Sequence, residues 1–351
     1  MQKAAAAVAR RTQSCFSIAL LALLIGICVS TYLLAQHRGL ERWVTAESRD
    51  LAETNHIVFS TRGNFIDFEE RVILDEVPRA DYSKGGIYFF GTSNMEWAFQ
   101  TWDLPEDQRK FISNYGIAAS NHADQLQFIK YLIAYKGFLA AGERDLVVLG
   151  VSYHLAHVDS QFGGIWASVL RRRGLYTTTA DNQIAPVPMN PIERWLSIEQ
   201  ARSAGFILNL GRLAKGWLVA SLGPSQARLH NGDEYRQGWR EFMGDQWPQN
   251  IIKAVDILRE TILLVRSHHA KVMVLLLPQG TWMETLPFKA QYETPVRSLC
   301  AETATPLIDL SHSMNDDEFL DSNHLTVKGQ QRFRGLILGI IQDQLRIISE
   351  N

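Results

Sequence analysis

Short apolar runs alternate with helix-like patterns along most of the chain. Five runs of five to seven residues are rich in aliphatic and aromatic side chains, as buried strands are: 86–90, 111–117, 145–151, 271–277 and 306–310. Apolar positions recur at helical spacing from 94 onward and over 123–141, 251–268 and 329–348. Continuous apolar strands that alternate with helices predict an α/β fold, in which helices cover both faces of a parallel sheet.

The first apolar stretch is of another kind, because it holds twenty residues without a charge, from Phe16 to Ala35. As a helix it would be about 30 Å long, which matches the hydrocarbon core of a bilayer. A cleavable signal peptide is the alternative, but its apolar part usually has about 7–15 residues and ends in a small-residue cleavage site. Leu34-Ala35-Gln36 is no clear site of that kind. We therefore expect a retained transmembrane signal-anchor.

The charges are divided unevenly around this stretch. Residues 1–35 contain Lys3, Arg10 and Arg11 and no acidic residue. Because the whole chain has a net charge of −2, the part that follows residue 35 has a net charge of −5. The positive-inside rule then keeps the N-terminus cytoplasmic and sends the body across the membrane. The absence of any Asn-x-Ser/Thr acceptor favours a bacterial envelope, with a periplasmic body on the inner membrane. Four parts are expected: a basic head (1–15), the anchor (16–35), a polar lead-in (36–83) and an α/β domain (84–351).

Composition excludes several classes of protein. With 46% hydrophobic and 21% charged residues and a near-neutral net charge, the chain is neither disordered nor typical of nucleic-acid binders. Cys300 is the one cysteine beyond the anchor, which rules out a disulfide or a cysteine-based zinc site within the body. His154 and His157, followed by Asp159, lack the spacing of a zinc protease motif. We expect neither a metal nor a cofactor.

A long stretch over about 155–248 interrupts the alternation of strands and helices. It holds five of the nine tryptophans and the basic run 171–173, and we expect an insertion or cap over the carboxyl edge of the sheet, where open α/β sheets bind ligands. Its tryptophans fit either a sugar-stacking platform or ordinary packing. The apolar segment 204–222 fits either a helix on the membrane surface or a buried cap helix. Both alternatives stay open.

Two short motifs carry residue types suited to acyl chemistry. Gly91-Thr92-Ser93-Asn94 follows the first strand, where a serine at a helix N-terminus lies near backbone N–H groups that can stabilise an oxyanion. Asp321-Ser322-Asn323-His324 precedes the last helix and can place an imidazole between a nucleophile and a carboxylate. Taken singly, Ser93 could be a helix N-cap and Asp321 a turn residue. Their joint order along the chain favours catalysis.

That joint order resembles the SGNH, or GDSL-like, hydrolase superfamily. The resemblance covers about residues 84–155 and 250–348 and leaves the insertion outside. It implies a three-layer, flavodoxin-like α/β fold. It also implies that Ser93 is the nucleophile, that His324 is the general base and that Asp321 orients the histidine.

The middle blocks of the superfamily match with two changes. The second block resembles residues 114–120, where Ala119 stands at the position of the glycine whose N–H stabilises the oxyanion. The third resembles residues 150–153, where Ser152 replaces the asparagine that supplies a third donor. The resemblance thus implies an oxyanion hole made by Ser93, Ala119 and Ser152. We expect Asn94 and His154 to contact substrate.

Gly91-Thr92-Ser93 together with an anchor is similar to the envelope branch of that superfamily, which includes alginate O-acetylation proteins and the D-alanine-transfer protein of teichoic-acid modification. The resemblance implies an extracytoplasmic serine esterase or acyltransferase that moves acetyl, or else D-alanyl, between an acyl donor and an envelope or exported polysaccharide. It implies a multi-span membrane-bound O-acyltransferase as partner. The alternative from another class is a non-catalytic polysaccharide-binding or assembly subunit with the same fold.

Overall fold

The computed structural model describes residues 2–37, 39–40, 43–44, 47, 72, 77, 80–99, 101, 104–118, 120–157, 176–179, 184–221 and 232–350. Five parallel strands form one sheet in the order β2-β1-β3-β6-β7. Their bounds are Ile87–Phe90 (β1), Ile112–Asn114 (β2), Leu146–Val151 (β3), Lys271–Leu276 (β6) and Leu307–Asp309 (β7). This is the order of flavodoxin-like sheets, so the predicted parallel α/β fold is confirmed.

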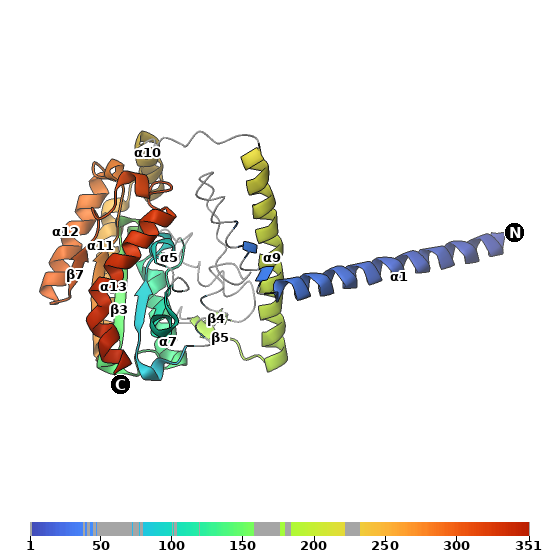
Figure 1. Ribbon diagram of the computed structural model, residues 1–351, viewed down its shortest axis with the longest axis horizontal. Coiled ribbons are helices and arrows are strands. Elements are labelled where there is room, and N and C mark those ends of the chain that lie inside the picture. The colour runs from blue at the N-terminus through green and yellow to red at the C-terminus, as the bar shows by residue number, and fades with distance from the viewer. Residues whose placement is uncertain are drawn as a thin grey trace.

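Helices cover both faces of this sheet (Figure 1). On one face α5 (Ser93–Ala98) packs with α13 (Val327–Ser349), and on the other α11 (Trp247–Ser267) packs with α7 (His122–Lys136) and α12 (Pro287–Glu302). The central strand β3 is buried along its whole length. Because no position of β3 faces water, its sequence carries no polar side chain, as the apolar run 145–151 predicts.

The helices begin and end where the sequence supplies the missing hydrogen bonds. Asn121 and Asp124 form a reciprocal capping box at the start of α7, and Gly137 ends that helix with a positive φ of 68°. At the start of α13, the Thr326 hydroxyl accepts a hydrogen bond from the Gly329 N–H at 3.1 Å. The caps of Asn121 and Thr326 fix the points at which two loops of the sheet's carboxyl edge end.

The second strand is shorter than its apolar pattern predicts. The run 111–117 predicts seven residues, but β2 ends at Asn114. There the Asn114 amide donates to the Met95 carbonyl at 3.0 Å, and a Cβ added to Gly116 would lie only 2.7 Å from the Glu96 nitrogen. The regular strand ends at this point because the chain packs against α5, although the N–H groups of Tyr115 and Ile117 still donate to the Phe89 and Gly91 carbonyls, at 2.7 and 3.0 Å.

Helix α12 is absent from the sequence prediction. Its buried side chains nevertheless follow helical spacing: Phe288, Tyr292, Val296, Leu299 and Cys300. Pro295 lies inside the helix and interrupts the local helix signal, since proline lacks an N–H and disfavours helix interiors. In this segment the spacing of the apolar residues indicates the helix, although Pro295 disfavours it.

The segment predicted as a polar lead-in contributes to the domain core. Val72, Val77 and Tyr82 are all buried in the same apolar cluster as the strands of the sheet. The Tyr82 hydroxyl forms a hydrogen bond of 2.8 Å with the Tyr115 hydroxyl. The core of the α/β domain therefore extends to residues before 84.

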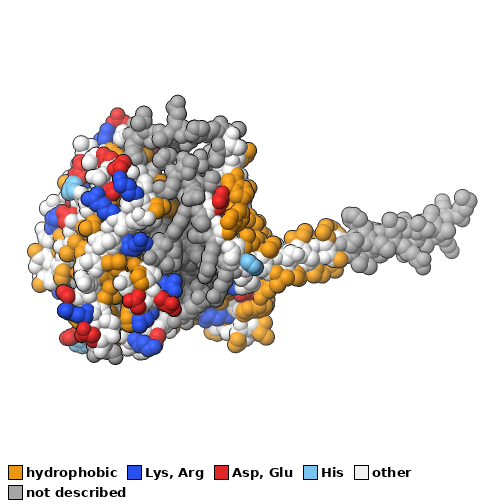
Figure 2. Space-filling view, in the orientation of Figure 1, with side chains coloured by type: hydrophobic (Ala, Val, Ile, Leu, Met, Phe, Trp, Pro, Cys, Tyr) orange, Lys and Arg blue, Asp and Glu red, His pale blue; other side chains and the backbone are white. Residues whose placement is uncertain are grey.

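Two long helices meet away from the sheet. Helix α1 (Gln2–Ala35) projects outward, and α9 (Pro191–Ser221) crosses its C-terminal end (Figure 1). A small cluster of Ala35, Val44, Phe206 and Leu213 is buried where they meet. Apolar side chains are exposed on both helices (Figure 2).

The membrane-spanning helix predicted over 16–35 is not found: within the part of the chain that the structure describes, no helix has the length and apolarity to cross a bilayer.

Smaller elements complete the described chain. A hairpin of β4 (Tyr176–Thr178) and β5 (Ile184–Pro186) precedes α9, and α10 (Gly232–Met243) follows it. The remaining short helices are α6 (Glu106–Arg109), η2 (Tyr82–Lys84), η4 (Gly142–Arg144), η5 (Tyr153–Ala156), η6 (Thr281–Met283) and η7 (Asp316–Glu318).

Candidate active site

Loops from several strands meet at the carboxyl edge of the sheet. Residues 91–92 follow β1, 115–121 follow β2, 152–157 follow β3 and 310–326 follow β7. Successive connections leave in opposite directions from β1 and β3, which are neighbours. At such a switch point an open α/β sheet leaves a crevice for ligands. The candidate residues of the sequence belong to these loops or to the helix turns that begin there, and Ala119 lies outside the described residues.

The turn after β1 is shaped by close packing. A Cβ added to Gly91 would lie 2.3 Å from the Cβ of Met95, so a larger residue would displace the turn. The Thr92 carbonyl accepts hydrogen bonds from the N–H groups of Met95 and Glu96, each at 3.0 Å, which starts α5. Ser93 is the first residue of this helix and is half-buried. Its N–H belongs to the first helical turn, which lacks intrahelical acceptors.

Asp321 and His324 form a hydrogen-bonded pair in the loop before α13. His324 Nδ1 and Asp321 Oδ2 are 2.7 Å apart, and Asp321 Oδ1 accepts the N–H groups of Asn323 and His324, each at 2.9 Å. Burial raises the pKa of Asp321, but the hydrogen bonds and charge of His324 outweigh it, so the pKa lies below its ordinary value. An ionised Asp321 holds the Nδ1–H tautomer of His324 and leaves Nε2 as an acceptor.

His324 Nε2 is buried and forms no hydrogen bond in the structure. The His324 ring lies 5.7 Å from the Trp97 ring, measured between centroids. No hydrogen bond joins this nitrogen to Ser93 within the described chain. Such contacts are often loose in proteins without substrate and tighten when it binds.

Asn94 and Asn323 connect the two candidate motifs directly. The Asn323 amide donates to Asn94 Oδ1 at 2.6 Å, and both side chains are buried. Asn94 follows Ser93 in the chain and Asn323 precedes His324. The hydrogen bond therefore brings together two motifs that are 229 residues apart. It places the Ser93 turn beside the Asp321–His324 pair.

His154 continues the same network from the loop after β3. Because Asn94 Oδ1 accepts from Asn323, the Asn94 amide donates to His154 Nδ1, at 3.1 Å, and the His154 proton lies on Nε2. Burial, with smaller contributions from the nearby His324 and His157, lowers the pKa of His154 well below its ordinary value. A neutral His154 thus presents a buried N–H donor that forms no hydrogen bond in the structure.

Ser152 meets part of what the oxyanion prediction requires. It is buried, and its hydroxyl has no hydrogen-bond partner in the structure. The neighbouring loop is tied to the nucleophile turn, since Ser120 Oγ donates to the Gly91 carbonyl at 3.1 Å and the Ile117 N–H donates to it at 3.0 Å. The Ser152 hydroxyl is therefore available as a hydrogen-bond donor, whereas Ala119 lies outside the described residues.

His154 and His157 form hydrogen bonds to different partners. His157 Nδ1 bonds to the His154 carbonyl, whereas His154 Nδ1 bonds to Asn94. Among the described residues, no group of three or more histidine, cysteine, aspartate or glutamate side chains is placed to hold a metal ion. Asp159 lies outside those residues.

Helix α10 supplies aromatic contacts that the sequence analysis did not assign to the site. The Trp239 ring stacks on His154 with a centroid distance of 3.9 Å and an angle of 13°. Tyr235 contacts Trp282 of η6, and Phe242 contacts His157. The signal was present in the sequence, because residues 235, 239 and 242 recur at helical spacing. Part of the insertion thus lies against the candidate site.

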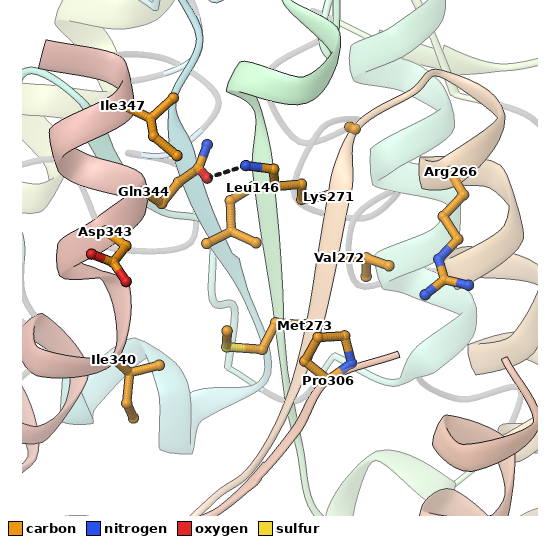
Figure 3. Close-up of a pocket in the computed structure, with 11 residues that line it drawn as sticks. Leu146, Arg266, Lys271, Val272, Met273, Pro306, Ile340, Asp343, Gln344 and Ile347 are labelled. Carbon is orange, nitrogen blue, oxygen red and sulfur yellow. Dashed lines mark hydrogen bonds between the residues drawn. The ribbon is translucent and has the colours of Figure 1, made fainter. Parts of the chain in front are cut away.

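A cavity at the other end of the sheet shares no residue with this site. Its volume is about 460 Å³, and it is lined by the first residues of β3 and β6 and by side chains of α13 (Figure 3). Lys271 Nζ donates to Gln344 Oε1 at 2.8 Å across it. Ligands of open α/β sheets bind at the carboxyl edge, so the catalytic candidates and not this cavity define the site.

Comparison with known proteins gives structural similarity alone. No protein-family model and no curated protein matches the sequence. A structure assigned as an acylhydrolase from Bacteroides fragilis NCTC 9343 is 13% identical, with a TM-score of 0.42, over 79% of this chain and 96% of that chain. A GDSL-like lipase from Bacteroides thetaiotaomicron VPI-5482 is 11% identical, with a TM-score of 0.41, over 80% and 99%.

A structure assigned as an arylesterase from Agrobacterium tumefaciens str. C58 is 10% identical, with a TM-score of 0.31, over 74% of this chain and 99% of that chain. Similarity at this level carries no argument about activity.

Proposed function

We propose that the protein is a serine esterase or O-acyltransferase in which Ser93, His324 and Asp321 form the catalytic triad. One observation carries the proposal. The Asp321–His324 hydrogen bond of 2.7 Å leaves a buried Nε2 without a partner, beside the turn that carries Ser93. An oriented histidine with a free ring nitrogen next to a serine is the arrangement that activates a hydroxyl nucleophile. The two motifs also resemble the first and last blocks of the SGNH superfamily.

In the first half-reaction Ser93 Oγ attacks the carbonyl carbon of an acyl donor. His324 Nε2 takes the serine proton, and Asp321 stabilises the imidazolium that forms. The N–H groups of Ser93 and Ala119 and the hydroxyl of Ser152 stabilise the oxyanion. The intermediate then expels the alcohol of the donor, which receives the proton from His324. The product is an ester of Ser93.

In the second half-reaction an acceptor hydroxyl attacks that ester. His324 removes the proton of the acceptor and returns it to Ser93 Oγ when the acyl group leaves. A sugar hydroxyl as acceptor gives transfer, and water gives hydrolysis. Asn94 and His154 contact the substrate in this proposal. The aromatic side chains of α10 support a sugar acceptor, because sugars stack on aromatic rings and Trp239 lies against His154.

The proposal extends to the cell envelope. Residues 16–35 are twenty uncharged residues after Arg10 and Arg11, and the side chains of residues 16, 18 and 19 lie outside the described part of the structure. This pattern supports a single-pass anchor with a cytoplasmic N-terminus and a periplasmic domain. The substrate class we propose is an envelope or exported polysaccharide, with acetyl as the acyl group and D-alanyl as the alternative. The partner is a multi-span membrane-bound O-acyltransferase that delivers the acyl group.

The test is release of acetate from an activated aryl ester by the full chain in detergent micelles. Ser93→Ala and His324→Ala are expected to remove at least about 10³-fold of the catalysed rate, since each takes away one triad member. His312→Ala and Ser349→Ala are the matched controls, because both residues are exposed and lie outside the site. Full activity in Ser93→Ala or His324→Ala would overturn the triad.

An inert wild type would favour the non-catalytic alternative. The acyl content of the native polysaccharide in a strain that carries Ser93→Ala then decides between the two. Loss of acyl groups in that strain supports catalysis with a specific donor. An unchanged acyl content leaves a polysaccharide-binding or assembly subunit as the function.

A further inference from the structure

Four of the apolar side chains that helix α9 exposes to solvent form one stripe, and Leu208, 51% exposed, lies outside it. Ile192, Leu196, Ile207 and Leu218 are 69%, 54%, 59% and 61% exposed. At about 100° per residue, these four positions fall within about 80° of arc on an α-helix. The stripe runs nearly the full length of the helix, from Pro191 to Ser221. A buried cap helix would cover such side chains. Of the two alternatives for segment 204–222, the exposed stripe therefore favours a helix on the membrane surface over a buried cap helix.

The stripe lies next to the end of α1. The rings of Tyr32 and Trp195 meet edge to face at 6.3 Å between centroids. Arg202 donates to Gln36 Oε1 at 2.9 Å and to Glu199 at 2.8 Å, so a polar bridge also holds the two helices together. Figure 1 shows α1 leaving α9 at a steep angle, with the sheet on the opposite side of α9.

A bilayer fits this arrangement better than another protein surface does. Exposed apolar side chains lie on α1 as well as on α9 (Figure 2), and α1 ends against α9 in the small cluster of Ala35, Phe206 and Leu213. Trp195 and Trp217 of α9 are 49% and 43% exposed, and tryptophan is enriched at the membrane–water boundary. Lys215 is exposed on the same helix, outside the stripe, and its long side chain can reach the phosphate groups of lipids.

We propose that α9 lies flat in the headgroup region of the bilayer that α1 enters, with Ile192, Leu196, Ile207 and Leu218 against the acyl chains. The inference rests on the anchor proposed above. An interfacial helix of 31 residues covers about 46 Å of membrane surface, and together with the α1 helix that crosses it such a helix fixes the orientation of the domain. The domain then stays at the membrane, within reach of an acyl donor delivered there.

The experiment places a fluorophore at single positions of the full chain in nanodiscs of phosphatidylcholine and phosphatidylglycerol. In a background with Cys15→Ser and Cys28→Ser, NBD is attached at Ile207→Cys or Leu218→Cys, while Cys300 is buried. Ile252→Cys on α11 is the matched control, because Ile252 is 64% exposed. Leu24→Cys reports on the anchor itself. Lipids with a spin label on the acyl chain quench fluorophores that contact them.

The expected result is about a twofold or greater loss of fluorescence at positions 207 and 218, with no loss at 252. Equal fluorescence at 207, 218 and 252 overturns the inference. If position 24 is quenched in that case, the anchor stands and only the placement of α9 is wrong. If position 24 is not quenched, the anchor proposal fails. A blue shift at 207 without quenching identifies a protein partner or a second copy and also overturns the inference.

Discussion

At the scale of single residues, Asp321 controls the state of the proposed base. It accepts three hydrogen bonds, two from backbone N–H groups and one from the His324 ring. Because its pKa lies below the ordinary value, the carboxylate is ionised throughout the neutral pH range. The charge holds the His324 ring in the tautomer that leaves Nε2 open to Ser93.

Replacing Asp321 by asparagine should lower kcat for the aryl ester by on the order of 10³- to 10⁴-fold. The neutral amide cannot stabilise the imidazolium and no longer specifies the tautomer of His324. Asp317→Asn is the matched control, because Asp317 is an exposed carboxylate paired with Lys328, and kcat should not change there. An unchanged kcat in Asp321→Asn would show that His324 does not act as the base.

The residues of the site were predictable to different degrees. Asp321 and His324 are three residues apart in one loop, so the sequence alone indicates that they can meet. Asn94 and His154 are 60 residues apart, and Asn94 and Asn323 are 229 apart. Their hydrogen bonds depend on how the strands order themselves in the sheet. The sequence therefore predicted a contact of Asn94 and His154 with substrate and did not predict that they bond to each other.

At the scale of elements, the turn between β1 and α5 depends on the absence of a side chain at Gly91. A Cβ added to Gly91 would also lie 3.2 Å from the carbonyl oxygen of Gly150. Strand β1, helix α5 and the end of β3 thus approach one another at a single point. The position of Ser93 follows from this packing.

Gly91→Ala should destabilise the fold by about 1–3 kcal/mol, as overpacked sites do, and should lower esterase activity because Ser93 shifts. Gly335→Ala is the matched control. Gly335 lies inside α13 with open space around it, and alanine there should raise stability by up to about 1 kcal/mol. Urea unfolding of both variants in detergent measures the difference. Equal stabilities of the two would contradict the packing argument.

A second contact between elements makes stability depend on pH. His122 of α7 stacks on Tyr292 of α12, and its Nε2 bonds to the tyrosine hydroxyl at 2.7 Å. Burial, with a smaller contribution from His157, lowers the pKa of His122 to about 3. The folded pKa is therefore below the unfolded value of about 6.5. The neutral His122 therefore contributes its full share of the unfolding free energy above pH 6.5, and this contribution is lost as the pH falls below that value.

His122→Gln removes this dependence. The unfolding free energy of the wild type should fall by about 2 kcal/mol relative to that of the variant between pH 7 and pH 5, because the unfolded wild type takes up a proton that the folded form excludes. Denaturant titrations at both pH values measure the change. Ser349→Ala, at an exposed position without a titratable side chain, should follow the wild type. A constant difference between wild type and His122→Gln would refute the assignment.

At the scale of the whole molecule, the distribution of charge divides the chain into two parts. Three basic residues and no acidic one lie within residues 1–35, and all 37 acidic residues follow. In the proposed topology, local attraction of phosphates to the basic head, rather than the net charge, sets the orientation of the anchor. On that proposal helix α9 lies on the far side of the anchor from the head.

Reversing the charge of the head should disturb this orientation. With alkaline phosphatase fused after Asn351, the wild type should be active outside the cytoplasm, and Arg10→Glu combined with Arg11→Glu should lose most of that activity. Arg346→Glu, at an exposed position of the domain, is the control. Immunoblots establish that the variants are equally abundant. Full phosphatase activity in the double variant would contradict the proposed topology.

The sequence by itself determined the α/β class, the five strands, most of the helices that flank them and the Asp321–His324 pair. These features depend on local spacing: continuous apolar runs, helical periodicity and residues three apart in one loop. Only the tertiary structure decided where β2 ends, which side chains join the motifs through Asn94, and how α10 and α9 are placed. Those features depend on contacts between residues far apart in the chain, whose geometry no local pattern specifies.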